Sequence, residues 1–153
     1  MKWLPPPTIK IYEALGAVAD GRVDLDGNST KVYSSTGNKF YEVTYDPDKK
    51  AIMANDNGSY WKGYLGYPSI AFLMKAGVIT YDEKIGSLLK GIAWKDINQM
   101  FKNDFTQTLD FILSEKTSKE RGLLADLVSR VERELISLDL GILGQKKAPP
   151  EGY

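Results

Sequence analysis

Between Arg22 and Ala54 the sequence alternates hydrophobic and polar residues with a period of two, and turn-forming residues interrupt the alternation. The three interruptions, Asp26-Gly27-Asn28, Thr36-Gly37-Asn38 and Pro47-Asp48, have compositions typical of tight turns. A period of two places successive side chains on opposite faces of a strand. The segment therefore predicts an antiparallel meander of three or four strands, on which helices must pack.

Helical patterns lie on both sides of this meander. Before it, apolar residues recur at helical spacing and predict a helix over about residues 9–20, with Thr8 as its N-cap and Gly21 as its glycine end. After it, Pro68 begins a short apolar helix that ends near Gly77. Because this second helix is apolar almost all round, we expect it to be buried against the sheet.

From Tyr81 to about Leu140 the chain reads as helical. A first segment covers about residues 81–92, a long second helix runs from Trp94 to Leu113, and the capping-box pattern Thr117–Glu120 begins a third. Apolar residues of the third helix form a seam at alternating steps of four and three: Leu124, Val128, Val131, Leu135, Leu138 and Ile142. The seam can pair with the second helix of the same chain or with a second chain, and the short link between the helices favours the same chain.

These patterns predict an α+β fold in one domain over residues 1–143. Residues 1–80 supply the N-terminal helix, the meander and the short buried helix, and residues 81–143 form a helical hairpin or three-helix extension. Residues 144–153 are polar and rich in proline and glycine, and are expected to be a disordered tail.

The chain contains neither cysteine nor histidine. Zinc sites built on those ligands are excluded, as is catalysis that uses a Ser-His-Asp triad or a Cys-His pair. Acid–base chemistry would have to use Asp, Glu, Lys or Tyr side chains. We therefore expect no metal site and no cofactor, and an enzyme is the less favoured class.

Composition also narrows the partners and the location. Twenty basic and twenty acidic residues give a formal net charge of zero, which does not support nucleic-acid binding although a local patch is possible. No signal-peptide core and no membrane-spanning run of apolar residues is present. A cytoplasmic protein without a membrane partner is the expectation.

The loop of residues 55–67 is the leading candidate site. It places several aromatic and polar side chains between the meander and the short helix: Asn55, Asp56, Tyr60, Trp61, Lys62, Tyr64 and Tyr67. Aromatic rings can stack on a base, a sugar or another protein, and the lysine can contact an anion or a ring. Ordinary turn chemistry and the covering of a core explain the same residues without a ligand.

The segment from about residue 31 to residue 75 resembles the layout of the SWIM zinc finger. That family places Cys-x-Cys on a β-hairpin, often with a following Asp, and Cys-x-His at the start of a helix, often after a Pro. The corresponding residues here are Ile52, Ala54, Asp56, Pro68, Ser69 and Ala71. All four ligand positions lack a zinc ligand, so the resemblance implies a metal-free strand–loop–helix unit, in a family associated with protein and DNA binding.

Three functions follow as hypotheses. The first is a non-catalytic binding or assembly module that uses residues 55–67 to contact a protein or, less favoured, a nucleic acid. The second is a small-molecule enzyme with Asp56 and Lys62 as first candidates, which requires a deep pocket with convergent ionisable groups. The third is a structural homodimer that associates through the C-terminal helices.

Overall fold

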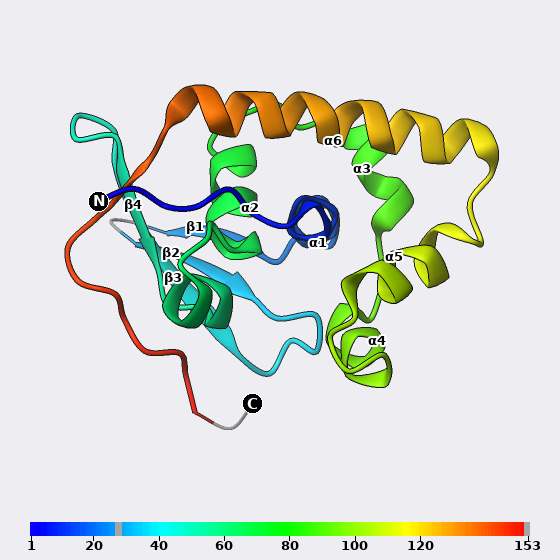
Figure 1. The fold of residues 1–153 in the computed structure, drawn as a ribbon, viewed down its shortest axis with the longest axis horizontal. Helices are drawn as coiled ribbons and strands as arrows, with labels where there is room; N and C mark the ends of the chain where they lie inside the picture. Colours follow the sequence, from blue (N-terminus) through cyan, green and yellow to red (C-terminus); the bar gives the residue numbers. More distant parts are fainter. Residues whose placement is uncertain (27–28, 152–153) are drawn as a thin grey trace.

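The computed structural model describes residues 1–26 and 29–151 and has the expected α+β architecture. Helix α1 (Thr8–Ala19) precedes four strands, β1 (Val23–Asp26), β2 (Ser29–Tyr33), β3 (Phe40–Asp46) and β4 (Ala51–Ala54). A π-helical turn, η1 (Gly58–Lys62), and helix α2 (Tyr67–Lys75) follow. In Figure 1, α1 is seen end-on, with the sheet and α2 on one side, the short helices of residues 83–113 on the other, and the long helix of residues 118–138 across the top.

The meander is confirmed, and it gains a strand that the sequence pattern does not predict. Strands β1 to β4 pair antiparallel in sequence order, and β5 (Gly141–Ile142) adds to β4 in parallel, with Ile52 opposite Ile142. The turns at Thr36-Gly37-Asn38 and Pro47-Asp48 are present, and Gly27-Asn28 lies outside the described residues. At the second of these turns, Asp46 Oδ1 accepts from the backbone N–H of Asp48 at 3.0 Å.

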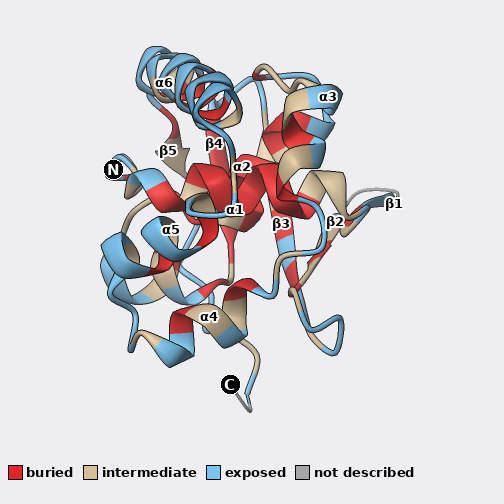
Figure 2. Cartoon of the chain, turned by 90° about the vertical axis from the view of Figure 1, so that its right-hand side faces the viewer, coloured by how far each residue is buried: buried red, intermediate tan, exposed pale blue. Residues whose placement is uncertain are grey.

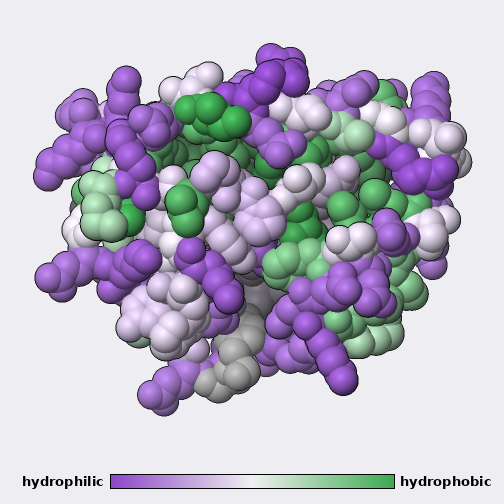
Figure 3. Space-filling model, viewed as in Figure 1, coloured by the Kyte–Doolittle hydropathy of each residue, from purple (hydrophilic) through white to green (hydrophobic). Residues whose placement is uncertain are grey.

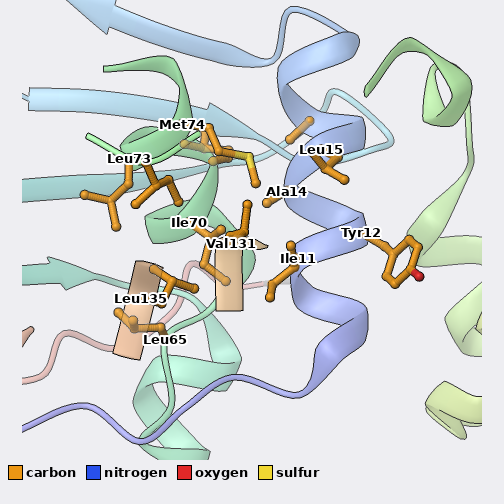
Figure 4. Packing of buried hydrophobic residues seen from close by; sticks show 14 of the residues in the cluster. Ile11, Tyr12, Ala14, Leu15, Leu65, Ile70, Leu73, Met74, Val131 and Leu135 are labelled. Carbon is orange, nitrogen blue, oxygen red and sulfur yellow. The ribbon is translucent and has the colours of Figure 1, made fainter. Parts of the chain in front are cut away.

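The core lies where α1, α2 and the long C-terminal helix α6 (Ser118–Leu138) meet on the sheet (Figure 2). Figure 4 shows Val131 of α6 between Ile70 of α2 and Ile11 of α1. All three side chains are buried. Burial of these three helices on one another thus fixes the position of α1, whose other side is available to form a site.

The limits of α1 and α2 follow their sequence signals with one correction. Helix α1 begins at Thr8 itself, after Pro7, so Thr8 is not the N-cap; its hydroxyl donates to Glu132 of α6 at 3.5 Å. Gly21 and Gly77 follow the two helices with φ of 70° and 78°, the left-handed conformation that a helix end favours in glycine.

The long helix expected from Trp94 to Leu113 is wrong. The chain instead forms α4 (Trp94–Met100) and α5 (Phe105–Leu113), joined by a turn in which Lys102 and Asn103 have φ of 53° and 62°. Asp104 then caps α5, because its Oδ1 accepts from the Gln107 N–H at 3.2 Å. Before these helices, residues 81–92 hold only the short helix α3 (Glu83–Gly86) and the 3₁₀ turn η2 (Ser87–Leu89).

Helix α6 has the predicted capping box and most of the predicted seam. Thr117 Oγ1 accepts from the Glu120 N–H, and Glu120 Oε1 accepts from the Thr117 N–H at 2.9 Å. Leu124, Val128, Val131 and Leu135 are buried, whereas Ile142 belongs to β5 and not to the helix. The seam packs mainly on α1 and α3, in place of the expected partner helix 94–113 (Figure 1).

The two ends of the chain run along the edge of the sheet. Lys2 bridges to Gly141, and Leu4 bridges to Tyr64. Residues 144–151 form no helix or strand, and Lys39 Nζ donates to the backbone oxygen of Glu151. The disorder expected for this tail stays a prediction. Among the described residues, no helix has both the length and the apolar character needed to cross a bilayer.

Candidate functional site

A pocket of about 660 Å³ opens between α1, the loop around η1, and α4 with the start of α5. Its floor includes Lys10 and Glu13 of α1, and its other walls include Trp61 near η1 and Trp94 on α4. The volume falls within the range of roughly 300–1,000 Å³ that is usual for small-molecule sites. The side of α1 that faces away from the sheet core therefore contributes to a ligand-sized cavity.

A buried ion pair lies on the pocket floor. Lys10 Nζ is 2.9 Å from Glu13 Oε1, and the two side chains are only 14% and 5% exposed. The same ammonium lies 4.6 Å from the centre of the Phe105 ring, a cation–π contact that joins α1 to α5. Burial by itself lowers the pKa of Lys10, but the acidic groups around it, Glu13 foremost, outweigh this and raise the pKa above its ordinary value. Lys10 is thus a cation at neutral pH.

Tyr64 forms the wall beside this pair. Its ring packs so closely on Gly58 that a Cβ there would lie 2.4 Å from a ring carbon, and any larger residue at position 58 would displace the ring. Burial raises the pKa of the Tyr64 hydroxyl, although Lys10 opposes the shift. The phenol therefore stays protonated and can donate a hydrogen bond within the pocket.

Asp56 stabilises the loop that carries Tyr64 through hydrogen bonds from Ser59. Its Oδ1 accepts from the Ser59 hydroxyl at 2.6 Å and its Oδ2 from the Ser59 N–H at 3.2 Å. A Cβ at Gly66 would overlap the carboxylate, so the chain approaches Asp56 as closely as only glycine permits. Burial raises the pKa of Asp56, and the two Ser59 hydrogen bonds oppose the shift. Asp56 shapes the loop and does not line the pocket.

Arg22 also lines the pocket and is held by several contacts. Its Nε is 3.2 Å from Asp20 Oδ2, and its Nη1 donates to the Tyr33 carbonyl at 2.8 Å. The guanidinium also lies 6.0 Å from the centre of the Tyr67 ring. Two hydrogen bonds and one ring fix the guanidinium in place, so this wall is rigid before any ligand binds.

Helix α4 supplies the wall opposite the loop. Trp94 and Asn98, four residues apart on one face of α4, are 3% and 9% exposed. The helix is tied to the sheet by the Lys95 N–H, which donates to Ser35 Oγ at 3.1 Å. Asn98 Oδ1 has no hydrogen-bond partner among the described residues although the side chain lines the pocket. An unpaired buried amide is costly, so its presence here requires a reason.

The structure brings four of the seven predicted site residues to the pocket and places three elsewhere. Trp61, Lys62, Tyr64 and Tyr67 line it. Asn55 Oδ1 instead accepts from the Glu42 N–H at 2.9 Å, and Asp56 bonds Ser59, so both have the turn roles that the alternative interpretation gave them. Tyr60 packs edge-on against Trp61, with ring centres 4.7 Å apart, and supports the rim from outside.

Sequence reasoning missed the residues that α1 and α4 contribute. Lys10 and Glu13 are the charged residues of the otherwise apolar sequence TIKIYEALGAVA, and this was the available signal, because charges on an almost wholly buried helix need partners. The sequence holds no such signal for Asn98, because this residue lies among other polar residues. Its role depends on the break between α4 and α5, which the apolar spacing did not reveal.

The positions that match zinc ligands in the resembled layout are all interior. Ile52 and Ala54 lie on β4, Ser69 and Ala71 lie on α2, and each is at most 1% exposed. Burial of this kind fits a packed strand–helix corner. The resemblance to the zinc finger itself stays a prediction.

One family model covers nearly the whole chain. Residues 3–141 match the family described as Uncharacterised conserved protein UCP014422. Comparison with curated proteins and with solved structures gave no significant match.

Proposed function

The chain belongs to that uncharacterised family, and we propose from the pocket itself that it is a binding protein for a small organic molecule with a flat ring. The observation that carries this proposal is that one cavity of about 660 Å³ combines the buried pair Lys10–Glu13 with several aromatic side chains. The rings come from five separate elements or loops: Tyr41, Trp61, Tyr64, Tyr67, Trp94 and Phe105. Aromatic walls with a few fixed polar groups are typical of sites for ring-bearing ligands.

Binding without catalysis is favoured by how the charges are held. Lys10 is paired with Glu13, and Arg22 is paired with Asp20. These four charges are thus fixed by their partners and suited to orienting a ligand, as expected of a preorganised binding site. We infer a cytoplasmic binding protein whose site is largely formed in the absence of ligand.

The test compares the native protein with a variant whose pocket is filled. Asn57 is exposed, lines the pocket and makes no side-chain capping bond, so Asn57→Trp places a bulky ring at the mouth without disturbing the core. We expect compounds with planar rings to raise the melting temperature of the native protein and to lose this effect with N57W. If no ring-bearing compound stabilises the native protein more than N57W, the proposed function is wrong.

An enzyme remains the alternative from another class, and the pocket changes its candidate residues. Convergent ionisable groups are present, but they are Lys10 and Glu13 and not Asp56 with Lys62. Incubating each stabilising compound with native protein and with the double variant K10M/E13L, followed by mass spectrometry, separates the two classes. Turnover by the native protein alone would establish an enzyme.

Binding of a protein partner is the second candidate function, because one large aromatic side chain is exposed on the rim of the pocket. Trp61 is 70% exposed on the rim, and large aromatic residues are frequent anchors of protein interfaces. We expect Trp61→Ala to remove captured partners and Trp61→Phe to retain most of them. An identical set of captured proteins with native protein and with W61A would remove this candidate.

A further inference from the structure

The side-chain oxygen of Asn98, Oδ1, is a buried acceptor that the proposed function does not yet explain. This side chain is 9% exposed, lies on the pocket wall, and has no partner for Oδ1 among the described residues. The backbone oxygen of Asn98 accepts from the Asn103 N–H at 2.8 Å, so this oxygen has a partner while the side-chain Oδ1 has none among the described residues. A buried acceptor without a partner is accounted for if a ligand supplies the donor.

The chemistry around Asn98 restricts that donor. A carboxamide can accept one hydrogen bond and donate another side by side, and the edge of adenine presents the complementary pair, the N6 amino group and N7. Trp94 lies one helical turn away, and Tyr67 and Trp61 line the same cavity. Bases are commonly held between such rings and such amides.

The second restriction is the charge of the pocket. Of the described residues that line it, four are cationic, Lys10, Arg22, Lys62 and Lys95, and one is anionic, Glu13. Lys10 and Arg22 each have a carboxylate partner, so the exposed Lys62 is the cation considered for an anionic group of the ligand. In the described part of the chain, no carboxylate lies within 4.0 Å of Lys62 Nζ.

We propose that the ligand is an adenine nucleotide of about monophosphate size, with its base against Asn98 and its phosphate at Lys62. This inference rests on the proposed function, because it names the ligand class of the same pocket. The exposed ammonium of Lys62 contacts the phosphate as a point charge. Trp61, next to Lys62 on the rim, covers the ligand from the solvent side.

The experiment divides the ligand into its two halves. AMP, adenosine and ribose 5-phosphate are titrated calorimetrically into the native protein. We expect AMP to bind about tenfold more tightly than adenosine, because adenosine lacks the phosphate and loses its charge-assisted contact with Lys62. Ribose 5-phosphate should bind most weakly, because it lacks the base. Affinity for AMP should fall as sodium chloride rises, whereas affinity for adenosine should not.

Two variants assign the contacts. Lys62→Glu should weaken the affinity for AMP by about tenfold or more and leave the affinity for adenosine unchanged. Lys119→Glu, an equal change of net charge on the exposed start of α6, is the matched control and should leave both affinities unchanged. Asn98→Leu, of similar size, should fold at least as well as the native protein, because it removes a buried oxygen, Oδ1, that has no partner among the described residues.

Base selectivity distinguishes a contact between Asn98 and the base from a purely structural role of Asn98, because a structural role would leave the preference between bases unchanged. The native protein should prefer AMP to UMP by about tenfold, and N98L should lose this preference. Tryptophan fluorescence should report the same binding, and the part of the change that Trp61→Phe removes belongs to Trp61, because Trp94 also lines the pocket.

Each outcome supports or overturns a separate part of the proposal. Equal affinity for adenosine and AMP would overturn the phosphate contact while the proposed binding of a ring stands. Equal affinity for AMP and UMP would overturn the reading of the base by Asn98. No binding of any of the three probes, with ring-bearing compounds still stabilising the native protein but not N57W, would overturn the nucleotide and leave the proposed function intact.

Discussion

Helix α1 with α2 and α6 forms a tightly packed region, whereas α4 and α5 form an open one. Ile11, Ala14 and Leu15 of α1 are fully inaccessible to solvent. In contrast, Met100 and Phe111 of the α4–α5 region are 57% and 46% exposed, and hydrophobic side chains are visible over these helices on the right of Figure 3. The pocket lies at the boundary, so one wall is set by a dense core and the other by two short helices held through a few contacts.

The contrast between the two regions explains how the site is positioned. Three of the contacts that hold α4 and α5 against the core are the Trp94 indole on Gly16, the Lys95 N–H to Ser35, and the Lys10 ammonium on Phe105. Each of them also borders the pocket. Substitutions in the packed region should therefore change stability without changing binding, whereas substitutions at the boundary should change both.

The largest expected effect comes from a cavity in the packed region. Leu15→Ala should lower the free energy of unfolding by about 3 kcal/mol, because a fully buried leucine leaves a void that the dense core cannot fill. The same change at Leu109 of α5, which is only partly buried, should cost about 1 kcal/mol. Urea denaturation measures both, and equal losses would contradict the contrast between the two regions.

The next effect is at the contact between the regions. In Gly16→Ala the new Cβ would lie 2.7 Å from Trp94 Nε1 and 3.2 Å from the Leu89 oxygen, so the indole must move. We expect a net loss of about 1 kcal/mol, since overpacking outweighs the helix-forming gain of alanine. Near-ultraviolet circular dichroism should show the displacement of Trp94.

Gly122→Ala on α6 provides the matched control for that change. It has no atom within 4 Å of the new Cβ, so only the helix-forming gain remains and stability should rise by up to about 1 kcal/mol. If G16A is stabilised as much as G122A, the packing of the Trp94 indole does not require a close approach to α1 at position 16.

A smaller effect is the pH dependence contributed by Asp56. Because its pKa in the folded protein is raised, the folded state retains this proton to higher pH than the unfolded state, and stability falls as the pH rises between the two pKa values. The stability of native protein relative to Asp56→Asn should therefore be greater at pH 4 than at pH 7 in urea denaturation.

Ser59→Ala sharpens the same prediction. The Ser59 hydrogen bonds lower the pKa of Asp56, so removing the hydroxyl should extend this fall in stability to higher pH. A pH profile of D56N that runs parallel to that of the native protein would show that Asp56 titrates alike in the folded and unfolded states.

The smallest effect is expected at the pocket rim. Trp61→Ala should change the free energy of unfolding by no more than about 0.5 kcal/mol, because the side chain is 70% exposed. The same measurement on Trp94→Ala, which empties a buried site, should show a loss of about 3 kcal/mol. A large loss for W61A would mean that the rim belongs to the packed region.

Elements whose signals are local could be predicted from the amino-acid sequence. The alternation of Tyr41 and Val43 with exposed neighbours, the capping box of Thr117 with Glu120, and Gly21 after α1 all act within a few residues, and all three have the predicted structure. The rim residues Trp61 and Lys62 were also found, because aromatic and charged side chains in a loop are visible without a fold.

The way in which distant segments meet depends on tertiary packing and could not be predicted from local patterns. Strand β5 exists because the chain returns from α6 to the edge of β4, and two residues carry too little pattern to predict it. The turn at Asn103 separates α4, which carries Asn98 on the pocket wall, from α5, and Lys10 reaches Phe105 only when α5 packs beside α1. Such contacts join residues far apart in sequence, and their energy comes from shared burial that no local spacing encodes.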